Sequence, residues 1–407
     1  MLSRFGREEK EALCRVIDAS DKTLSRYSFS YRAEGGEVWN FEREFARWLG
    51  RKYCVAVNSG TSALFVAIKA LSVKTDALLG ENNCLEQTSE NIALPAYTFV
   101  ADAEAVIASG NRPFFQDIDE KDYCVELDAQ LPLNIIVHTL GNVCPPERFE
   151  RKIPYDLEYK VIEDCAQCVG GAWKGKKAGT FGDISIFSGQ GTKNLSCGEG
   201  GWLCMDDEEL MERCRAVANH GDYYKFKFPN KKYPYLQNIL GHNLRMTEMQ
   251  AAIARCQLKK LPMFLKQFKK NAELIFDLLP AGIEPPYIPK EVTHAYFILG
   301  CKYKGDVRNK PRFLQKLLVA RRKAGLLWSK KTPDIPGSNN PPGYTIGGGY
   351  SQPLYELPLY RRYKLSCPNT EKVIGEVLWF DIHRWSSEEY IKKNMEIVNK
   401  VYRETEG

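Results

Sequence analysis

Seven short apolar segments, each bounded by turn-forming residues, recur through the first half of the chain. They hold Val, Ile and Phe in nearly continuous runs rather than in strict alternation with polar residues. Such runs are typical of strands that helices cover on both faces. The segments are YCVAVNS (53–59), NIALPAY (91–97), RPFFQDID (112–119), LNIIVHT (133–139), KVIEDC (160–165), DISIFSG (183–189) and GWLCMDD (201–207).

Helical patterns fall between some of these segments. Leu64, Ile68 and Leu71 stand at i, i+4 and i+7 after the turn NSGT, and a second candidate helix covers about 98–109, starting at Thr98. Strand, helix and strand in this order predict an α/β domain built on a largely parallel sheet.

A long helical pattern follows, from Met246 to about Pro280. Its apolar stripe is read at Met249, Ile253 and Cys256, and Pro262 is expected to break or kink the helix.

The Pro-rich stretch EPPYIPK (284–290) predicts a boundary between a large domain, 1–283, and a smaller α+β domain, 284–407. The elements expected in the smaller domain are a strand in 295–303, a basic helix over 310–325, a strand over 377–383 and a closing helix over 386–403.

Composition excludes several classes of protein. The net charge of +6 over 407 residues is too small to favour nucleic acid, although YYKFKFPNKKYPYL (223–236) mixes basic and aromatic residues. The apolar runs are too short for a membrane span, and the first residues lack the apolar core of a secretory signal. The 13 scattered cysteines predict a reduced, cytoplasmic protein.

No metal site is expected. The five histidines are far apart and none falls in an HExxH motif, while the CxxC of Cys165 and Cys168 lacks a second pair or a redox context.

The loop SGQGTKNLSCGEGG (188–201) carries one lysine, Lys193, among small residues. Thr192 and Asn194 stand where a phosphate-binding P-loop needs Gly and Ser or Thr, and Asn194 also replaces the third glycine of the dinucleotide fingerprint. These two nucleotide-binding interpretations therefore fail, and a solvated surface lysine remains the simple alternative.

Two further features lie at the ends of predicted strands, where open parallel sheets bind ligands. Gly60, Thr61 and Ser62 open a helix whose free N–H groups suit a phosphate, although simple helix capping is the alternative. Asp164 and Gln167 of EDCAQ follow another strand, where an ordinary turn is the alternative. A phosphate-type helix start, an acid and a lysine in a tight loop are together what pyridoxal phosphate needs.

Beyond these residues, the chain resembles the DegT/DnrJ/EryC1/StrS family of sugar aminotransferases. The likeness spans most of residues 1–280 and fades in the C-terminal part. It rests on FEREFARWLGRKYCVAVNSGTSAL (41–64), LPAYTFVADAEAVIASGNRPFFQDID (94–119), VIEDCAQCVGGAWKGKKAGTFGDISIFS (161–188), TKNLSCGEGGWLCMDDEEL (192–210) and GHNLRMTEMQAAIARCQLKKL (241–261).

This resemblance implies the fold of type I pyridoxal-phosphate transferases. That fold has a large domain with a mostly parallel seven-stranded sheet sandwiched by helices, and a smaller C-terminal α+β domain.

The resemblance also assigns roles to individual residues. Lys193 would form the Schiff base with the cofactor and carry protons, Asp164 would hold the ring nitrogen, and Gln167 would contact the ring's 3-oxygen. Phe99 would stack on the ring face, and Asn243, close to Arg245, would reach the phosphate of the neighbouring subunit. The residues implied around the cofactor's own phosphate are Gly60, Thr61, Ser62 and Ser188.

The chemistry implied is the transfer of an amino group from L-glutamate or L-glutamine to a keto sugar, in this family most often nucleotide-linked, within a homodimer that shares its active sites. Two rivals stay open: a pyridoxal-phosphate-dependent sugar dehydratase of the same fold, and a non-catalytic regulatory protein that binds the cofactor or a sugar. Gly189 stands where many relatives carry an aromatic residue, so that wall of the pocket is expected to be more open.

Overall fold

The computed structural model describes residues 5–19, 35–72, 89–154, 157–221, 232–233, 235–236, 239–326, 346–347, 349–381 and 386–407. Most of the basic and aromatic stretch 223–236 lies outside these residues.

A seven-stranded sheet forms the centre of the molecule, in the order β1-β9-β8-β5-β4-β2-β3. Its strands are β1 (Tyr53–Val57), β2 (Asn91–Pro95), β3 (Arg112–Gln116), β4 (Leu133–Val137), β5 (Lys160–Asp164), β8 (Ile184–Ser188) and β9 (Gly201–Met205). Each strand falls within one of the seven apolar segments, so that prediction is confirmed.

The sheet is mostly parallel, as expected. β3, β2, β4, β5 and β8 run parallel to one another, whereas β9 is antiparallel to both β8 and β1. The carboxyl ends of β5 and β8 therefore meet at one edge, where ligands bind in such sheets.

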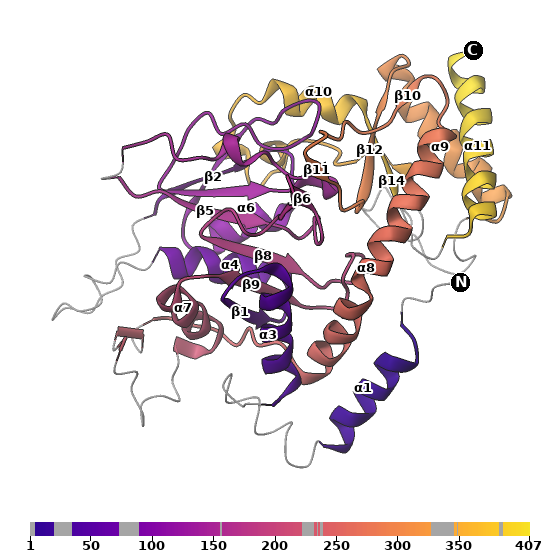
Figure 1. Ribbon diagram of the computed structural model, residues 1–407. Helices are drawn as coiled ribbons and strands as arrows, with labels where there is room; N and C mark the ends of the chain where they lie inside the picture. Colours follow the sequence, from indigo (N-terminus) through magenta and orange to yellow (C-terminus); the bar gives the residue numbers. More distant parts are fainter. Residues whose placement is uncertain are drawn as a thin grey trace.

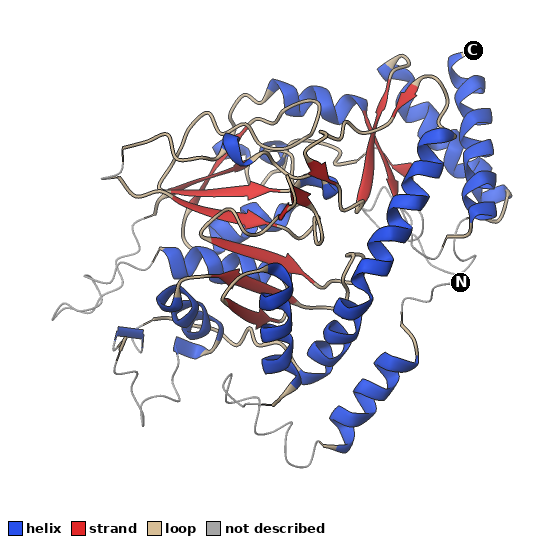
Figure 2. Ribbon diagram, viewed as in Figure 1, coloured by secondary structure: helices blue, strands red, loops and turns tan. Residues whose placement is uncertain are grey.

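Helices cover both faces of this sheet, as Figure 2 shows. In β1, Val55 and Val57 pack into one core, while Cys54 and Ala56 pack into the other. Because successive side chains of a strand point to opposite faces, burial on both sides requires the continuous apolar runs seen in the sequence. The helices on the first face are α4 (Gly60–Leu71), α6 (Val100–Ala108) and α7 (Glu208–Ala218), and those on the second are α3 (Glu37–Leu49) and α8 (Glu248–Asp277), against which α1 (Arg7–Asp18) packs.

Small elements join the strands of this sheet. They are η1 (Thr139–Gly141), η2 (Pro146–Arg148), and the short strands β6 (Ala172–Trp173) and β7 (Lys176–Lys177), which pair in the order β11-β6-β7 with β11 (Val292–Thr293).

A second, antiparallel sheet lies in the C-terminal part, in the order β10-β12-β14-β13. Its strands and the helices of the C-terminal part are β10 (Ile283–Glu284), β12 (Ile298–Tyr303), β13 (Ile346–Gly347), β14 (Val377–Asp381), η5 (Val307–Asn309), α9 (Lys310–Lys323), η6 (Leu354–Glu356), η7 (Arg361–Tyr363), α10 (Pro368–Glu376) and α11 (Glu388–Glu406). The two strands and two helices expected from the sequence are present as β12, β14, α9 and α11, whereas β10, β13, α10 and the short helices η5, η6 and η7 were not expected. Leu354, Tyr355 and Tyr360 pack into the core of the large sheet, so part of the C-terminal stretch returns to it. The division at 283/284 stays a prediction.

Helix α8 runs without a break from Glu248 to Asp277, through Pro262. It passes from beside α3 to beside α11 (Figure 1). The predicted break is therefore wrong, because Leu261 and Phe264 on either side of the proline are fully buried and hold the helix in place.

The apolar stripe predicted along α8 is also displaced. Met249 is exposed, whereas Ala251, Ala254 and Leu258 form the buried face. Small alanine side chains allow α3 to pack closely on this face.

Within the described part of the chain, no helix combines the length and hydropathy needed to cross a bilayer.

The exposed Pro262 yields a prediction about stability. Replacing it by alanine restores a backbone N–H and removes the ring's clash with the preceding turn, so we expect Pro262→Ala to raise the free energy of unfolding by about 1–3 kcal/mol. Thermal and chemical denaturation would measure the change. Lys259→Ala, at an exposed position of the same helix, is the control and should change stability by less than about 0.5 kcal/mol. A Pro262→Ala protein no more stable than the wild type would contradict the prediction.

Candidate active site

Lys193 lies in the loop between β8 and β9, where its N–H donates to the carbonyl of Gln190 at 2.9 Å. Its ammonium group stands over the ring of Phe297, 4.5 Å from the centroid. Burial lowers the pKa of Lys193 to about 8, against the attraction of Asp164 and Asp102, which favours the charged form. The lysine therefore faces the interior rather than the solvent, which removes the simple surface alternative.

Asp164 is the last residue of β5 and is nearly fully buried. One of its carboxylate oxygens, Oδ1, accepts the N–H of Ala166 at 2.7 Å. Burial raises the pKa of Asp164, while this amide and the charge of Lys193 act in the opposite direction. The structure thus places the predicted acid and the predicted lysine in electrostatic contact.

Gln167 is held by both ends of its amide. Its Oε1 accepts the N–H of Leu140 at 2.8 Å, and its Nε2 donates to the hydroxyl of Tyr350 at 3.4 Å. The sequence did not single out Tyr350, which belongs to the Gly- and Pro-rich stretch of sequence 332–354. The position of this tyrosine brings that part of the chain to the site.

The start of α4 and the end of β8 form a narrow cradle. A Cβ atom added at Gly60 would stand 2.9 Å from the Cβ of Ser188 and 3.1 Å from its Oγ. Glycine is therefore needed for Ser188 to approach the helix start, and Thr61, next in the chain, is exposed there. A helix start with a hydroxyl beside it suits a phosphate group.

Ser62 has a capping role in this cradle. Its N–H donates to Oγ of Ser59 at 3.0 Å, and its own Oγ donates to the Asn58 side chain at 2.6 Å. Ser59 is the N-cap residue of α4, so the simple capping role proposed as the alternative is filled by Ser59 together with Ser62. Gly60, Thr61 and Ser188 remain beside it.

Phe99 is the N-cap residue of α6, and 57% of its surface is exposed. Exposure of a large aromatic ring three residues before the buried Asp102 is consistent with a flat ligand at this position.

Asn243 is also exposed, and its backbone forms an isolated bridge to Asn219, whose side chain accepts from Arg245 at 2.6 Å. Among the described residues, the Asn243 side chain makes no hydrogen bond to the groups above. The structure of one chain does not bring Asn243 into that cluster.

Gly189 faces the core rather than the pocket. A Cβ atom there would stand 2.7 Å from Sγ of Cys197 and 3.0 Å from the ring of Trp202. The expectation of a more open wall is therefore wrong at this position, because the side on which a side chain would stand is already filled.

One buried group of potential metal ligands, His138, Glu163 and Cys165, lies in the described part of the chain. Glu163 accepts from Nε2 of His138 at 3.0 Å and from the N–H groups of Gly179, Phe181 and Gly182. Nδ1 of His138 accepts the N–H of Cys144, and burial raises the pKa of the Cys165 thiol well above its usual value. Hydrogen bonds already satisfy His138 and Glu163, and burial favours the neutral thiol of Cys165.

The arrangement fits pyridoxal phosphate. It offers a cradle that a Cβ would fill, a lysine amine with a pKa near neutrality, a buried acid at a strand end and an exposed aromatic ring. These are the donor types that a phosphate, an aldehyde, a pyridine nitrogen and a planar ring require.

Comparisons with known proteins agree with this interpretation. A sequence profile of the DegT/DnrJ/EryC1/StrS aminotransferase family matches residues 25–325. GDP-perosamine synthase of Escherichia coli O157:H7 is 28% identical over 279 residues, 66% of this chain and 70% of that protein. UDP-N-acetyl-3-dehydro-alpha-D-glucosamine 3-aminotransferase of Acidithiobacillus ferrooxidans is 32% identical over 293 residues, 69% of this chain and 72% of that protein. The X-ray structure of an aminotransferase from Psychrobacter cryohalolentis matches with a TM-score of 0.79 at 23% identity, covering 100% of this chain and 99% of that chain.

The contact between Gly60 and Ser188 yields a prediction. In Gly60→Ala the added methyl group pushes Ser188 away from the helix start, so we expect the dissociation constant for pyridoxal phosphate to rise about tenfold, or about 1.4 kcal/mol. Equilibrium dialysis of the purified variant would measure it. Gly191→Ala is the matched control, because the nearest atom to its Cβ, the carbonyl oxygen of Gly198, is 3.9 Å away. Equal effects of the two substitutions would show that the cradle is not where the phosphate binds.

Proposed function

Because the chain belongs to the DegT/DnrJ/EryC1/StrS aminotransferase family, whose enzymes depend on pyridoxal phosphate, we propose that it transfers an amino group from L-glutamate or L-glutamine to a nucleotide-linked keto sugar. The observation that carries the proposal is the juxtaposition of Lys193 with the buried Asp164 at the strand end. The acceptor class is supported by the names of two relatives, since one makes a GDP-linked sugar and the other aminates a UDP-linked one.

Three side chains carry the chemistry. Pyridoxal phosphate, when bound, supplies an aromatic ring that takes up the electron pair released at the substrate carbon. Lys193 anchors the cofactor covalently and then moves the proton between the substrate carbon and the cofactor carbon. Asp164 would hold the proton on the ring nitrogen, and Gln167, whose amide is held by Leu140 and Tyr350, would donate to the ring oxygen.

The remaining residues bind and orient. Gly60, Thr61 and Ser188 receive the phosphate, with Ser62 as part of the cap beside them. Phe99 covers one face of the ring. Phe297 stands beside the lysine, and the face of its ring attracts the charged amine, whereas burial favours the neutral form.

We further propose a homodimer in which Asn243 completes the phosphate site of the neighbouring subunit. Its exposure on a single chain supports this role. A cytoplasmic location is supported by the cysteines, because all twelve in the described residues are free thiols.

The rival functions make different products. A sugar dehydratase consumes no stoichiometric amino donor, and a regulatory protein yields no product. The presence of Lys193 opposite an acid favours transamination over both, because neither rival needs an amine that carries protons repeatedly.

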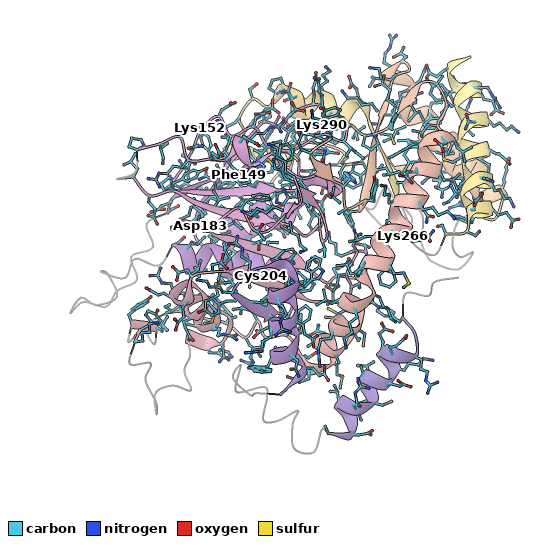
Figure 3. All side chains as sticks on the ribbon, in the orientation of Figure 1. Phe149, Lys152, Asp183, Cys204, Lys266 and Lys290 are labelled. Carbon is cyan, nitrogen blue, oxygen red and sulfur yellow. The ribbon has the colours of Figure 1, made fainter. Side chains whose placement is uncertain are left out.

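The proposed reaction is tested by incubating the purified protein, pyridoxal phosphate and L-glutamate with a panel of nucleotide-linked keto sugars. We expect 2-oxoglutarate and an amino sugar in equal amounts, and a loss of activity of at least about a thousandfold in Lys193→Ala. Lys290→Ala is the matched control, since this lysine is exposed on the surface (Figure 3). Turnover of the sugar without release of 2-oxoglutarate would identify the dehydratase instead.

The lowered pKa of Lys193 gives a prediction about pH. A covalent bond to an aldehyde needs the neutral amine, and a pKa of about 8 makes half of it neutral at that pH instead of near 10.5. The rate at which the apo protein incorporates pyridoxal phosphate should therefore rise up to about pH 8 and then level off. Stopped-flow absorbance would follow it, with Lys193→Ala as the blank. A rate that still climbs in proportion to hydroxide at pH 10 would contradict the lowered pKa.

A further inference from the structure

Asp102 is a second acid at the site, and nothing in the transamination scheme above uses it. It lies in the first turn of α6 and is 1% exposed. Its Oδ2 accepts the hydroxyl of Thr98 at 2.7 Å. Its Oδ1 is buried and has no hydrogen-bond partner within the described residues. A buried carboxylate oxygen without a donor is costly, so this oxygen calls for an explanation.

This oxygen belongs to a carboxyl group that interacts with the acid of the site. The carboxyl groups of Asp102 and Asp164 are within hydrogen-bonding reach, and each changes the ionisation of the other. Two buried carboxyl groups within hydrogen-bonding reach of each other do not both ionise, because water does not screen the repulsion between their charges. A proton on Oδ1 of Asp102 would turn the unpartnered acceptor into a donor, with Asp164 as its acceptor.

The surroundings decide which of the two acids keeps the proton. Asp164 accepts a backbone N–H from Ala166 and feels the charge of Lys193, and both favour its ionised form. Asp102 also feels the charge of Lys193, but its only donor among the described residues is one neutral hydroxyl, and burial followed by repulsion from Asp164 raises its pKa well above the usual value. The other titratable groups that influence the pair are His138 and Tyr350, and Tyr97 adjoins Tyr350. The proton therefore belongs on Asp102.

We propose that Asp102 is a neutral carboxylic acid whose O–H donates to Asp164, and that it acts as a positioning residue for the acid that holds the cofactor ring nitrogen. The inference rests on the role of Asp164 in the proposed function. A carboxylate that accepts this hydrogen bond is oriented and less basic, so the proton that it shares with the ring nitrogen stays on the nitrogen. Asp102 also keeps a second negative charge out of the buried site.

The shared proton can be tested without cofactor, on the apo protein. A carboxyl group whose pKa is higher in the folded than in the unfolded state stabilises least at high pH, because folding must then take up a proton. Asp102→Asn removes that requirement and keeps a donor of the same shape. We expect the variant to gain stability over the wild type as pH rises from 4.5 to 7.5, by up to roughly tenfold in the folding equilibrium constant per pH unit.

Denaturation series at several pH values would measure this gap, the difference in free energy of unfolding between the variant and the wild type. Glu104→Gln, at an exposed carboxyl on the same helix, is the matched control and should show a gap that does not change with pH. A constant gap for Asp102→Asn as well would overturn the proposal.

The positioning role is tested on the cofactor. Asp102→Leu removes the donor and should raise the dissociation constant for pyridoxal phosphate about tenfold, whereas Asp102→Asn should stay within about threefold of the wild type. Equal losses in both variants, or no loss in Asp102→Leu, would overturn this role. Should Asp102→Leu fail to fold, the pH series on Asp102→Asn decides alone.

Failure of the wider function would look different. If Asp164→Ala bound the cofactor and turned over like the wild type, the assignment of Asp164 would fall. The stability difference between Asp102→Asn and the wild type, measured on the apo protein, would still test the shared proton independently.

Discussion

The register between β5 and β8 is the constraint on which the site depends. These neighbouring strands run parallel, with Asp164 opposite Ile186, so the acid at the end of one strand and Ser188 at the end of the other reach the same edge of the sheet. The chain that leaves β8 then carries Lys193 back toward the acid before β9 begins. A slip of one residue in β5 would turn Asp164 to the opposite face of the sheet and put Glu163 or Cys165 in its place. Burial of both faces of the sheet prevents that slip, because every residue of these two strands except Lys160 is buried.

The charges of the site are balanced within a small volume. One lysine faces two acids, and burial weakens the tendency of all three to ionise. A lysine that is easily deprotonated and an acid that stays ionised are both needed for proton transfer at neutral pH. Burial alone would favour the neutral form of Asp164 as well as of Lys193. The amide of Ala166 and a protonated Asp102 separate their behaviour, so that the lysine can release its proton while the acid keeps its charge.

The strands of the large sheet and several residues of the candidate site could be predicted from the sequence, because short stretches of sequence indicate them. Continuous apolar runs marked all seven strands, and the turns after them marked Asp164 and Gly60. Gly60, Asp164 and Gln167 could be identified because each lies at or next to a strand end. The resemblance to a family supplied Phe99, Ser188 and Asn243. Asp102 and Tyr350 could not be found in the same way. Asp102 lies within a helix, and its burial depends on tertiary packing that the local sequence does not reveal. Tyr350 comes from a part of the chain more than 180 residues beyond Gln167. Gly189 was misread for a similar reason, since only the packing of Cys197 and Trp202 shows which face of the strand it occupies.

The course of α8 has a mechanical consequence. Its first half, up to Leu261, packs in the core between the large sheet and α3, while its second half, from Phe264 onward, packs in the core beneath the C-terminal sheet. Pro262 lies between the two halves and removes a backbone hydrogen bond there. A helix whose two halves pack in different cores bends where its internal hydrogen bonding is weakest. Any rotation of the C-terminal sheet toward the lysine would therefore concentrate as flexure at this single turn, and Tyr350 would travel with the moving side.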